Sequence, residues 1–128
     1  MSDKPVFGVT LRKYELPTED FDRNLRLFLL SMGLIRPGAK KSPLEVIFKH
    51  ILVEKKPISV EDLAEMTEIT ESAVRYHLER LKALRLIDGR KEYFLAENDL
   101  SVAFRVFRRY VLEETLDRIE GYVSALVK

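Results

Sequence analysis

Polar side chains recur at steps of three and four residues between positions 70 and 82. On a helix with about 3.6 residues per turn, this spacing gathers them on one face. The set mixes hydroxyl, guanidinium, carboxylate and ammonium groups, which are the donors and acceptors that can distinguish base edges in the DNA major groove. A solvated face is the commoner explanation for such a pattern on an isolated amphipathic helix. The predicted face consists of Ser72, Arg75, Tyr76, Glu79 and Lys82, with Thr70 just before it.

Two helices joined by a tight turn would position this face. Ser59 followed by Asp62 forms a weak capping box, so the first helix is expected to begin at Val60. Thr70 is a good cap for a second helix over about residues 71–84, the predicted recognition helix. A helix-turn-helix favours base reading over a merely solvated face, because its second helix is the one that enters the major groove. The inner side of that helix is apolar, with Ala73, Val74, Leu78, Leu81 and Leu84.

A β-hairpin is predicted directly after the recognition helix, over residues 86–95. Asp88 and Gly89 separate two β-prone segments, and Asp-Gly is a strong signal for a two-residue hairpin turn. Arg90 and Lys91 would then sit beside the tip, within reach of phosphates or of the minor groove. The hairpin is short, which argues against deep insertion into that groove.

In these features the chain resembles the winged helix-turn-helix transcriptional regulators of the ArsR-like kind. The resemblance covers about residues 42–95 and rests on Leu63-Ala64-Glu65, on the run Ser72-Ala73-Val74-Arg75-Tyr76-His77-Leu78, and on Leu81 with the strand Leu86-Ile87. It implies a dimeric protein that binds double-stranded DNA and regulates transcription. One departure is Glu68, which stands in the turn where glycine is usual and would cost on the order of 1 kcal/mol at positive φ.

Metal sensing, which many ArsR-like members perform through cysteines, is not expected here. The chain has no cysteine and only two histidines, His50 and His77, too few for a closed site without several carboxylates. A packed histidine is the favoured interpretation of both. No phosphate-binding glycine loop and no Ser/His/Asp arrangement stands out, so neither an enzyme nor a cofactor is predicted.

Composition agrees with one folded domain over residues 1–128. Hydrophobic residues make up 46% of the 128, enough for a real core without disulfides. The absence of cysteine fits a cytoplasmic location, and no apolar run is long enough for a signal peptide or a membrane span. Residues 36–91 carry 12 basic against 9 acidic side chains, a modest excess that predicts weak, salt-dependent affinity for nucleic acid.

An arm and a helix precede this core, in residues 1–35. Thr18 is expected to cap a helix that runs to about Met32 and stops at Gly33, and residues 5–14 are predicted as an extended arm or edge strand. A full capping box, Ser42-Pro43-Leu44-Glu45, should open the next helix, which ends near Lys55. Pro57 and Ile58 would form a short extended link that pairs with the wing.

One long helix is predicted for residues 98–128, with two apolar stripes. Leu100, Phe104 and Phe107 belong to the first stripe, and the second is rotated from it by about 130° at about 100° per residue. The second stripe repeats at steps of 4, 3, 4 and 3, the a/d spacing of a helix that pairs with another. Its residues, the predicted homodimer interface, are Leu112, Leu116, Ile119, Val123 and Leu126.

The sequence therefore predicts a mainly α protein with a small β-hairpin wing, namely a winged helix-turn-helix with additional N-terminal and long C-terminal helices. Its predicted function is sequence-specific recognition of double-stranded DNA by a homodimeric transcriptional regulator. Three alternatives stay open. The C-terminal stripe can pack on the helix at 18–32 of its own chain, the winged helix can serve as a protein-protein adaptor in a transcription or replication assembly, and Phe104, Phe107 and Tyr110 can line an effector pocket, although a packed core suits that spacing better.

Overall fold

The computed structural model describes residues 3–4 and 8–127, and its contacts divide the chain into two compact units. The first comprises Met1–Lys49 and the second His50–Lys128. Each unit has its own set of buried apolar side chains, so we describe them one at a time. Within the described residues, no helix is long and apolar enough to cross a bilayer.

The first unit contains helix α1 (Phe21–Ser31) and the beginning of helix α2 (Pro43–Glu54). Asp20 caps α1, because its side chain accepts a hydrogen bond from the Arg23 amide at 3.2 Å. The prediction of Thr18 as the cap was wrong. Instead the Thr18 backbone amide and carbonyl are held by the Asn24 side chain at 2.9 and 2.7 Å, which fixes the turn before the helix. Gly33, with φ +68°, ends the helical segment as expected.

The predicted edge strand at residues 5–14 is absent from its described part. Residues 5–7 lie outside the described residues, and residues 8–14 have no strand assignment. This segment is instead attached to the end of α1, where the Arg12 amide donates to the Ser31 carbonyl at 2.9 Å. Its apolar residues do not alternate regularly, so they cannot present the two faces that a half-buried strand requires.

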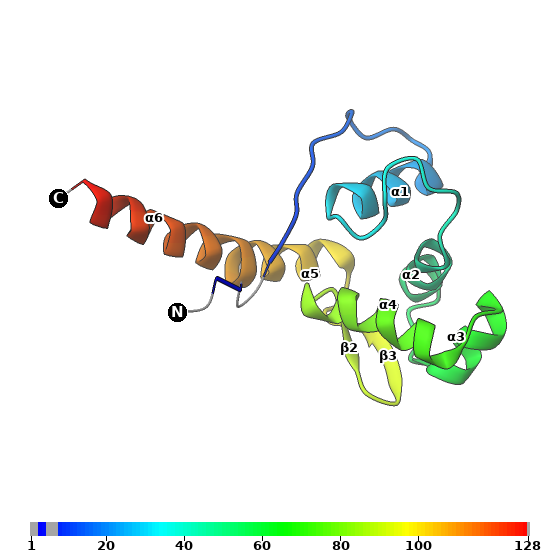
Figure 1. Ribbon diagram of the computed structural model, residues 1–128. Coiled ribbons are helices and arrows are strands. Elements are labelled where there is room, and N and C mark those ends of the chain that lie inside the picture. Colours follow the sequence, from blue (N-terminus) through cyan, green and yellow to red (C-terminus); the bar gives the residue numbers. More distant parts are fainter. Residues whose placement is uncertain (1–2, 5–7, 128) are drawn as a thin grey trace. The chain divides into compact units, whose positions relative to one another are not determined.

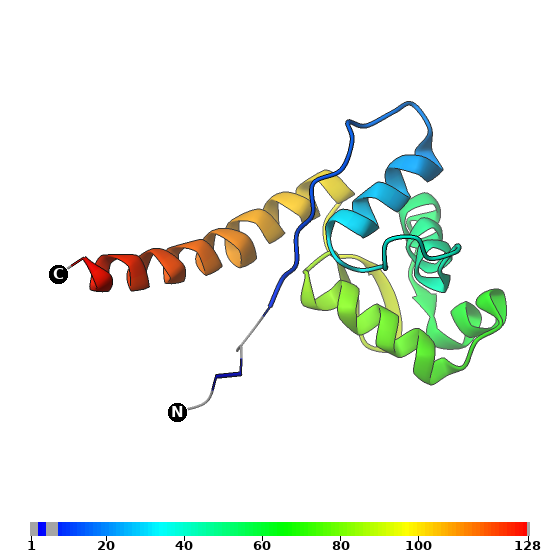
Figure 2. The ribbon, with the colours of Figure 1, turned by 45° about the horizontal axis from the view of Figure 1, so that its top comes forward.

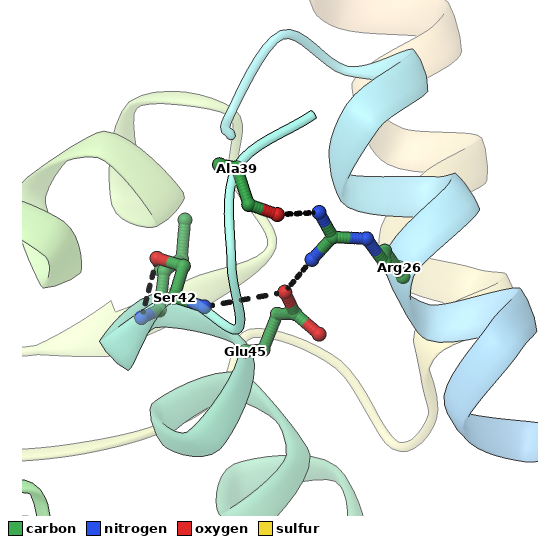
Figure 3. Close-up of polar contacts among 5 residues, drawn as sticks. Arg26, Ala39, Ser42 and Glu45 are labelled. Carbon is green, nitrogen blue, oxygen red and sulfur yellow. Dashed lines mark hydrogen bonds and ion pairs between the residues drawn. The ribbon is translucent and has the colours of Figure 1, made fainter. Parts of the chain in front are cut away.

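A buried ion pair fastens α1 to the start of α2. Glu45 completes the predicted capping box by accepting from the Ser42 amide at 3.3 Å, and it also receives the Arg26 guanidinium (Figure 3). The same guanidinium donates to the Ala39 carbonyl in the connecting segment. The Glu45 side chain is only 8% exposed, so one arginine neutralises a buried carboxylate and holds three parts of the unit together.

We predict that Arg26→Met destabilises the protein by about 3 kcal/mol, because it leaves the Glu45 carboxylate buried without its cation. Urea denaturation would measure the loss. The double variant R26M/E45M should recover much of it, since no buried charge remains. A double variant less stable than the single one would contradict this account.

The second unit has the winged helix-turn-helix arrangement (Figure 1). Strand β1 (Ile58–Ser59), helix α3 (Val60–Thr67) and helix α4 (Glu71–Ala83) follow the end of α2, and strands β2 (Ile87–Gly89) and β3 (Glu92–Leu95) form the wing. The sheet is antiparallel in the order β1-β3-β2, so the extended link before α3 pairs with the wing as predicted.

The predicted caps of this unit are confirmed, and so is most of its predicted core, although Ala73 is only half-buried and Met66 is exposed. Ser59 accepts from the Asp62 amide at 3.1 Å, and α3 begins at Val60. Side chains from the end of α2, α3, α4 and the segment after it, the sheet and the C-terminal helix make up the apolar core of the unit. Those with less than 2% of their surface exposed include Ile51, Val60, Leu63, Leu78, Leu81, Leu86, Ile87 and Phe107.

The corner between α3 and α4 contains a residue in the left-handed conformation that is not glycine. Glu68 ends α3 with φ +58° and ψ +35°, the region in which a Cβ atom is crowded by the backbone. Lys55 and Arg85, which follow α2 and α4, have the same handedness, with φ +55° and +61°. The positive φ that the sequence suggested at Glu68 is therefore present.

Replacing Glu68 with glycine should stabilise the protein by about 1 kcal/mol, because glycine adopts this conformation without the Cβ penalty. The melting temperature would report it. The matched control is Glu65→Gly, which removes the same charge from an exposed position inside α3 and should cost about 1 kcal/mol. If both variants shift the melting temperature in the same direction, the corner carries no such penalty.

The C-terminal helix differs from the regular α-helix that was predicted. Helix α5 (Leu100–Phe107), capped by Asp99, leads into a π-helical segment, η1 (Arg108–Glu113), and then into helix α6 (Glu114–Leu126). The three form one continuous rod, whose α6 end extends away from the wing and α4 (Figures 1 and 2). The prediction rests on a regular period of about 3.6 residues, and the spacing of hydrophobic residues does not reveal where α-helical hydrogen bonding gives way to π-helical hydrogen bonding.

Candidate nucleic-acid interface

Helix α4 presents two sides of opposite character. Val74, Leu78 and Leu81 have no exposed surface, so packing fixes the helix rigidly in the unit. On the other side Ser72, Arg75 and Glu79 are exposed, and Tyr76 keeps 63% of its surface accessible. The helix thus carries the predicted polar face on an ordered support, which recognition of base edges requires.

Neighbouring rings and charges orient Tyr76. The Arg80 guanidinium lies 5.6 Å from the centre of the tyrosine ring, in the range of a cation-π contact. The His77 ring meets the same tyrosine edge-on, with 5.6 Å between ring centres. Sequence reasoning did not include Arg80 in the site. Its position four residues after Tyr76 was the available signal, because residues at i and i+4 are neighbours on a helix.

A second contact connects the reading face to the wing. The hydroxyl of Tyr93, a residue of β3, donates to the Glu79 carboxylate across 3.5 Å. Burial raises the pKa of Tyr93, the negative charge of Glu79 raises it further, and Arg75 acts in the opposite direction. Arg75 and Glu79 therefore flank one hydroxyl of the wing. Tyr93 was expected only as a strand residue, since a pairing across the fold has no signature in local sequence.

The turn of the wing lies after Gly89, later in the sequence than predicted. Asp88 and Gly89 belong to strand β2, where they pair with Phe94 and Tyr93, so the assignment of Asp-Gly as the turn was wrong. Gly89 has φ +130°, and a Cβ atom there would lie 1.9 Å from the Glu92 carbonyl oxygen. Glycine is needed for this close backbone approach rather than for a two-residue turn. Arg90 and Lys91 consequently occupy the tip itself, both exposed.

Besides Glu79, which accepts from Tyr93, two of the predicted DNA-binding residues already have hydrogen-bond partners within the protein. The Thr70 hydroxyl accepts from the Ala73 amide at 3.1 Å and caps α4. The Lys82 ammonium donates to the Gly89 carbonyl at 2.8 Å and ties the helix to the wing. The other candidates are all exposed: Ser72 and Tyr76 on α4, Arg75 beside the Tyr93 hydroxyl, and Arg90 and Lys91 at the wing tip.

His77 is partly buried on the flank of α4 and has a perturbed titration. Burial of the ring, and secondly the charge of Arg80, lower the pKa of His77 below its ordinary value of about 6.5. Its Nδ1 atom is buried and has no hydrogen-bond partner among the described residues. This environment favours the neutral ring in the folded protein, in keeping with a packed histidine.

We predict that His77 makes the folded protein less stable in acid. The unfolded chain takes up a proton near pH 6.5 while the folded chain resists it, so the free energy of unfolding falls as pH drops through about 6.5 and levels off below the folded pKa. Denaturation at pH 7.5 and at pH 5 would measure the slope. His77→Phe keeps a ring in place without titrating and should flatten this slope; an unchanged slope would contradict the prediction.

The other candidates for chemistry give no further site. Among the described residues, no group of three or more His, Asp or Glu side chains is placed to hold a metal ion. The predicted effector pocket residues do not line one cavity: Phe104 and Phe107 pack together with 5.6 Å between ring centres and Phe107 is fully buried, whereas Tyr110 is 52% exposed near the guanidinium groups of Arg85 and Arg109. His50 is half-buried in α2.

Comparison with known proteins bears on one part of the chain. The sequence model of the bacterial regulatory proteins of the arsR family matches residues 51–88, which extend from the end of α2 through α3 and α4 into β2. Comparisons with curated proteins and with solved structures gave no match.

Residues 51–88 are thus similar to the arsR-family regulators, and the three-stranded sheet around them completes the winged helix-turn-helix fold of an ArsR-like regulator. The matched segment contains the whole of α3 and α4, and therefore every candidate reader on the outer face of α4. A helix-turn-helix of this family supports a protein that binds double-stranded DNA and regulates transcription.

Proposed function

We propose that this protein is a sequence-specific regulator of transcription that acts as a homodimer. Helix α4 enters the major groove, and the wing lies against the sugar-phosphate backbone. Ser72, Arg75 and Tyr76 contact base edges, with Glu79 as a further reader that Tyr93 holds in place. Arg90 and Lys91 contact phosphates.

The observation that carries this proposal is the exposed outer face of α4 beside a basic wing tip. Arg75 and Tyr76 are exposed on a helix whose inner side is completely buried, and Arg90 and Lys91 extend from the neighbouring hairpin. Arginine can donate two hydrogen bonds to a guanine edge, while cations at the tip neutralise phosphates without reading sequence. The arrangement supplies both contact types from one rigid unit.

A homodimer follows from the limited strength of one reading head. The excess of 12 basic over 9 acidic residues in segment 36–91 is only three charges, so one copy gains little from the phosphate backbone. Two copies related by a two-fold axis read two half-sites and add their binding energies. We assign the dimer interface to Leu112, Leu116, Ile119, Val123 and Leu126.

Selection from a random duplex library at two salt concentrations tests the proposal. A regulator of this kind should enrich palindromes whose half-sites are spaced by about one helical turn, 10 to 10.5 base pairs, with weaker recovery at the higher salt. If neither salt concentration yields an enriched sequence, the protein is not a sequence-specific regulator.

Arg75→Ala should abolish the preference for the selected sequence and weaken its binding by about 1–3 kcal/mol, because the bidentate contact with a base is lost. Fluorescence anisotropy with the selected and a scrambled duplex would separate the two effects. Arg23→Ala removes the same charge from an exposed position on α1 and should keep the preference. Equal losses in the two variants would assign Arg75 a purely electrostatic role.

A second candidate function, a winged-helix adaptor that binds another protein, is favoured by the carboxylates around the reading face. Glu71, Glu79 and Glu92 are exposed close to the readers and oppose the approach of phosphates. An adaptor would show no sequence preference for Arg75→Ala to remove. The library selection therefore separates the two functions directly.

A further inference from the structure

Two exposed readers of opposite charge stand one helical turn apart on α4. Arg75 and Glu79 are four residues apart in this helix, and side chains at that spacing are neighbours. A cation and an anion so placed attract each other and commonly form an ion pair. Among residues 3–4 and 8–127, however, no ion pair joins Arg75 to Glu79. Their separation points to a third group that engages both.

The hydroxyl of Tyr93 is such a group. It donates to the Glu79 carboxylate across 3.5 Å, and the Arg75 guanidinium lies beside the same hydroxyl. A phenolic oxygen can donate a hydrogen bond and also accept one, so it can face a carboxylate and a guanidinium at once. Burial and, after it, the charge of Glu79 raise the pKa of Tyr93, while Arg75 acts in the opposite direction. The hydroxyl therefore stays protonated at neutral pH and keeps its hydrogen for Glu79.

The wing holds Tyr93 in a fixed position against α4. Its strand β3 is the central strand of the sheet, where Tyr93 pairs with Ile58 of β1 on one side and Gly89 of β2 on the other. Only 2% of the surface of Tyr93 is exposed, so packing holds its ring before any ligand arrives. The Lys82 ammonium fastens β2 to α4 by donating to the Gly89 carbonyl at 2.8 Å. The hydroxyl is thus a preset part of the reading face.

We infer that Tyr93 is a positioning residue, whose hydroxyl keeps Arg75 and Glu79 from neutralising each other and so leaves Arg75 directed at a guanine edge. This inference rests on the DNA recognition proposed above and adds the residue that preserves its specificity. Without the hydroxyl, Glu79 is free to turn toward Arg75, and the two side chains would satisfy each other instead of a base.

The contact with Tyr93 leaves Glu79 able to bind a base as well. A distance of 3.5 Å is long for an O–H···O hydrogen bond, and an ionised carboxylate has about four acceptor sites. Glu79 can therefore still accept a hydrogen bond from a base amino group in the major groove. Tyr93 orients the carboxylate without using up its capacity.

Tyr93→Phe tests the inference, because it removes the hydroxyl and keeps the buried ring. The readout is the guanine preference, the ratio of dissociation constants for two duplexes. One is the selected duplex, and in the other the G·C pair that Arg75→Ala no longer distinguishes is changed to A·T. In Tyr93→Phe this ratio should fall about three- to tenfold, since Arg75 must leave Glu79 and be ordered again. Tyr14→Phe, which removes a hydroxyl from the first unit, should leave the ratio unchanged.

Glu79→Gln separates positioning from packing. Glutamine has no charge with which to draw Arg75 away, so E79Q alone should keep the guanine preference. The double variant Y93F/E79Q should recover that preference to within about twofold of E79Q, which completes a double-mutant cycle. Because Y93F and the double variant share the same change in the core, a difference between them cannot come from packing.

Three results would overturn the role of Tyr93 while recognition of DNA stands. In the first, Y93F keeps the guanine preference within about twofold of the parent. In the second, E79Q fails to recover the preference that Y93F has lost. In the third, Arg75→Ala keeps every base preference of the parent. If the parent chain enriches no sequence from the random library, the proposed function and this inference fail together.

Discussion

Val74, Leu78 and Leu81 lie on the inner side of α4 and are completely withdrawn from water, and the rest of the second unit is arranged around them. Their burial fixes both the position and the rotation of the helix. A helix held in this way leaves a defined set of side chains outward, and that set is what a nucleic acid would meet. In the proposed function the core of this small unit therefore serves recognition as well as stability, since a shift of the helix would change which side chains reach a base edge.

Two polar contacts join the wing to α4. The Lys82 ammonium reaches the Gly89 carbonyl, and the Tyr93 hydroxyl reaches Glu79. The first contact uses the ammonium of Lys82, a cation that a purely electrostatic binder would direct at phosphates. This contact orients the wing on α4 and leaves one cation fewer to attract DNA, in agreement with the small positive excess of residues 36–91. In the proposed homodimer, affinity comes from the two copies more than from charge.

Features governed by neighbours in sequence were predictable, and features governed by distant contacts were not. The caps at Ser59 and Thr70 and the box at Ser42 each depend on a residue two or three positions away, so their residue types identify them. The pairs Arg26 with Glu45 and Tyr93 with Glu79 join separate elements and leave no local pattern. The C-terminal helix was predictable only in part. Its two apolar stripes were visible in the sequence, whereas the π-helical segment η1 between them was not.

Gly89 tolerates substitution less well than the residues with positive φ that follow the helices. At Lys55, Glu68 and Arg85 a larger residue already occupies the left-handed region, at a modest energetic penalty. At Gly89 a Cβ atom would overlap a backbone carbonyl of the opposite strand, which no rearrangement of a side chain relieves. Under random mutagenesis the helix corners can drift through many residue types, whereas the wing accepts only one at this position. The hairpin that carries Arg90 and Lys91 is therefore the part of the interface with the least freedom to evolve in backbone shape.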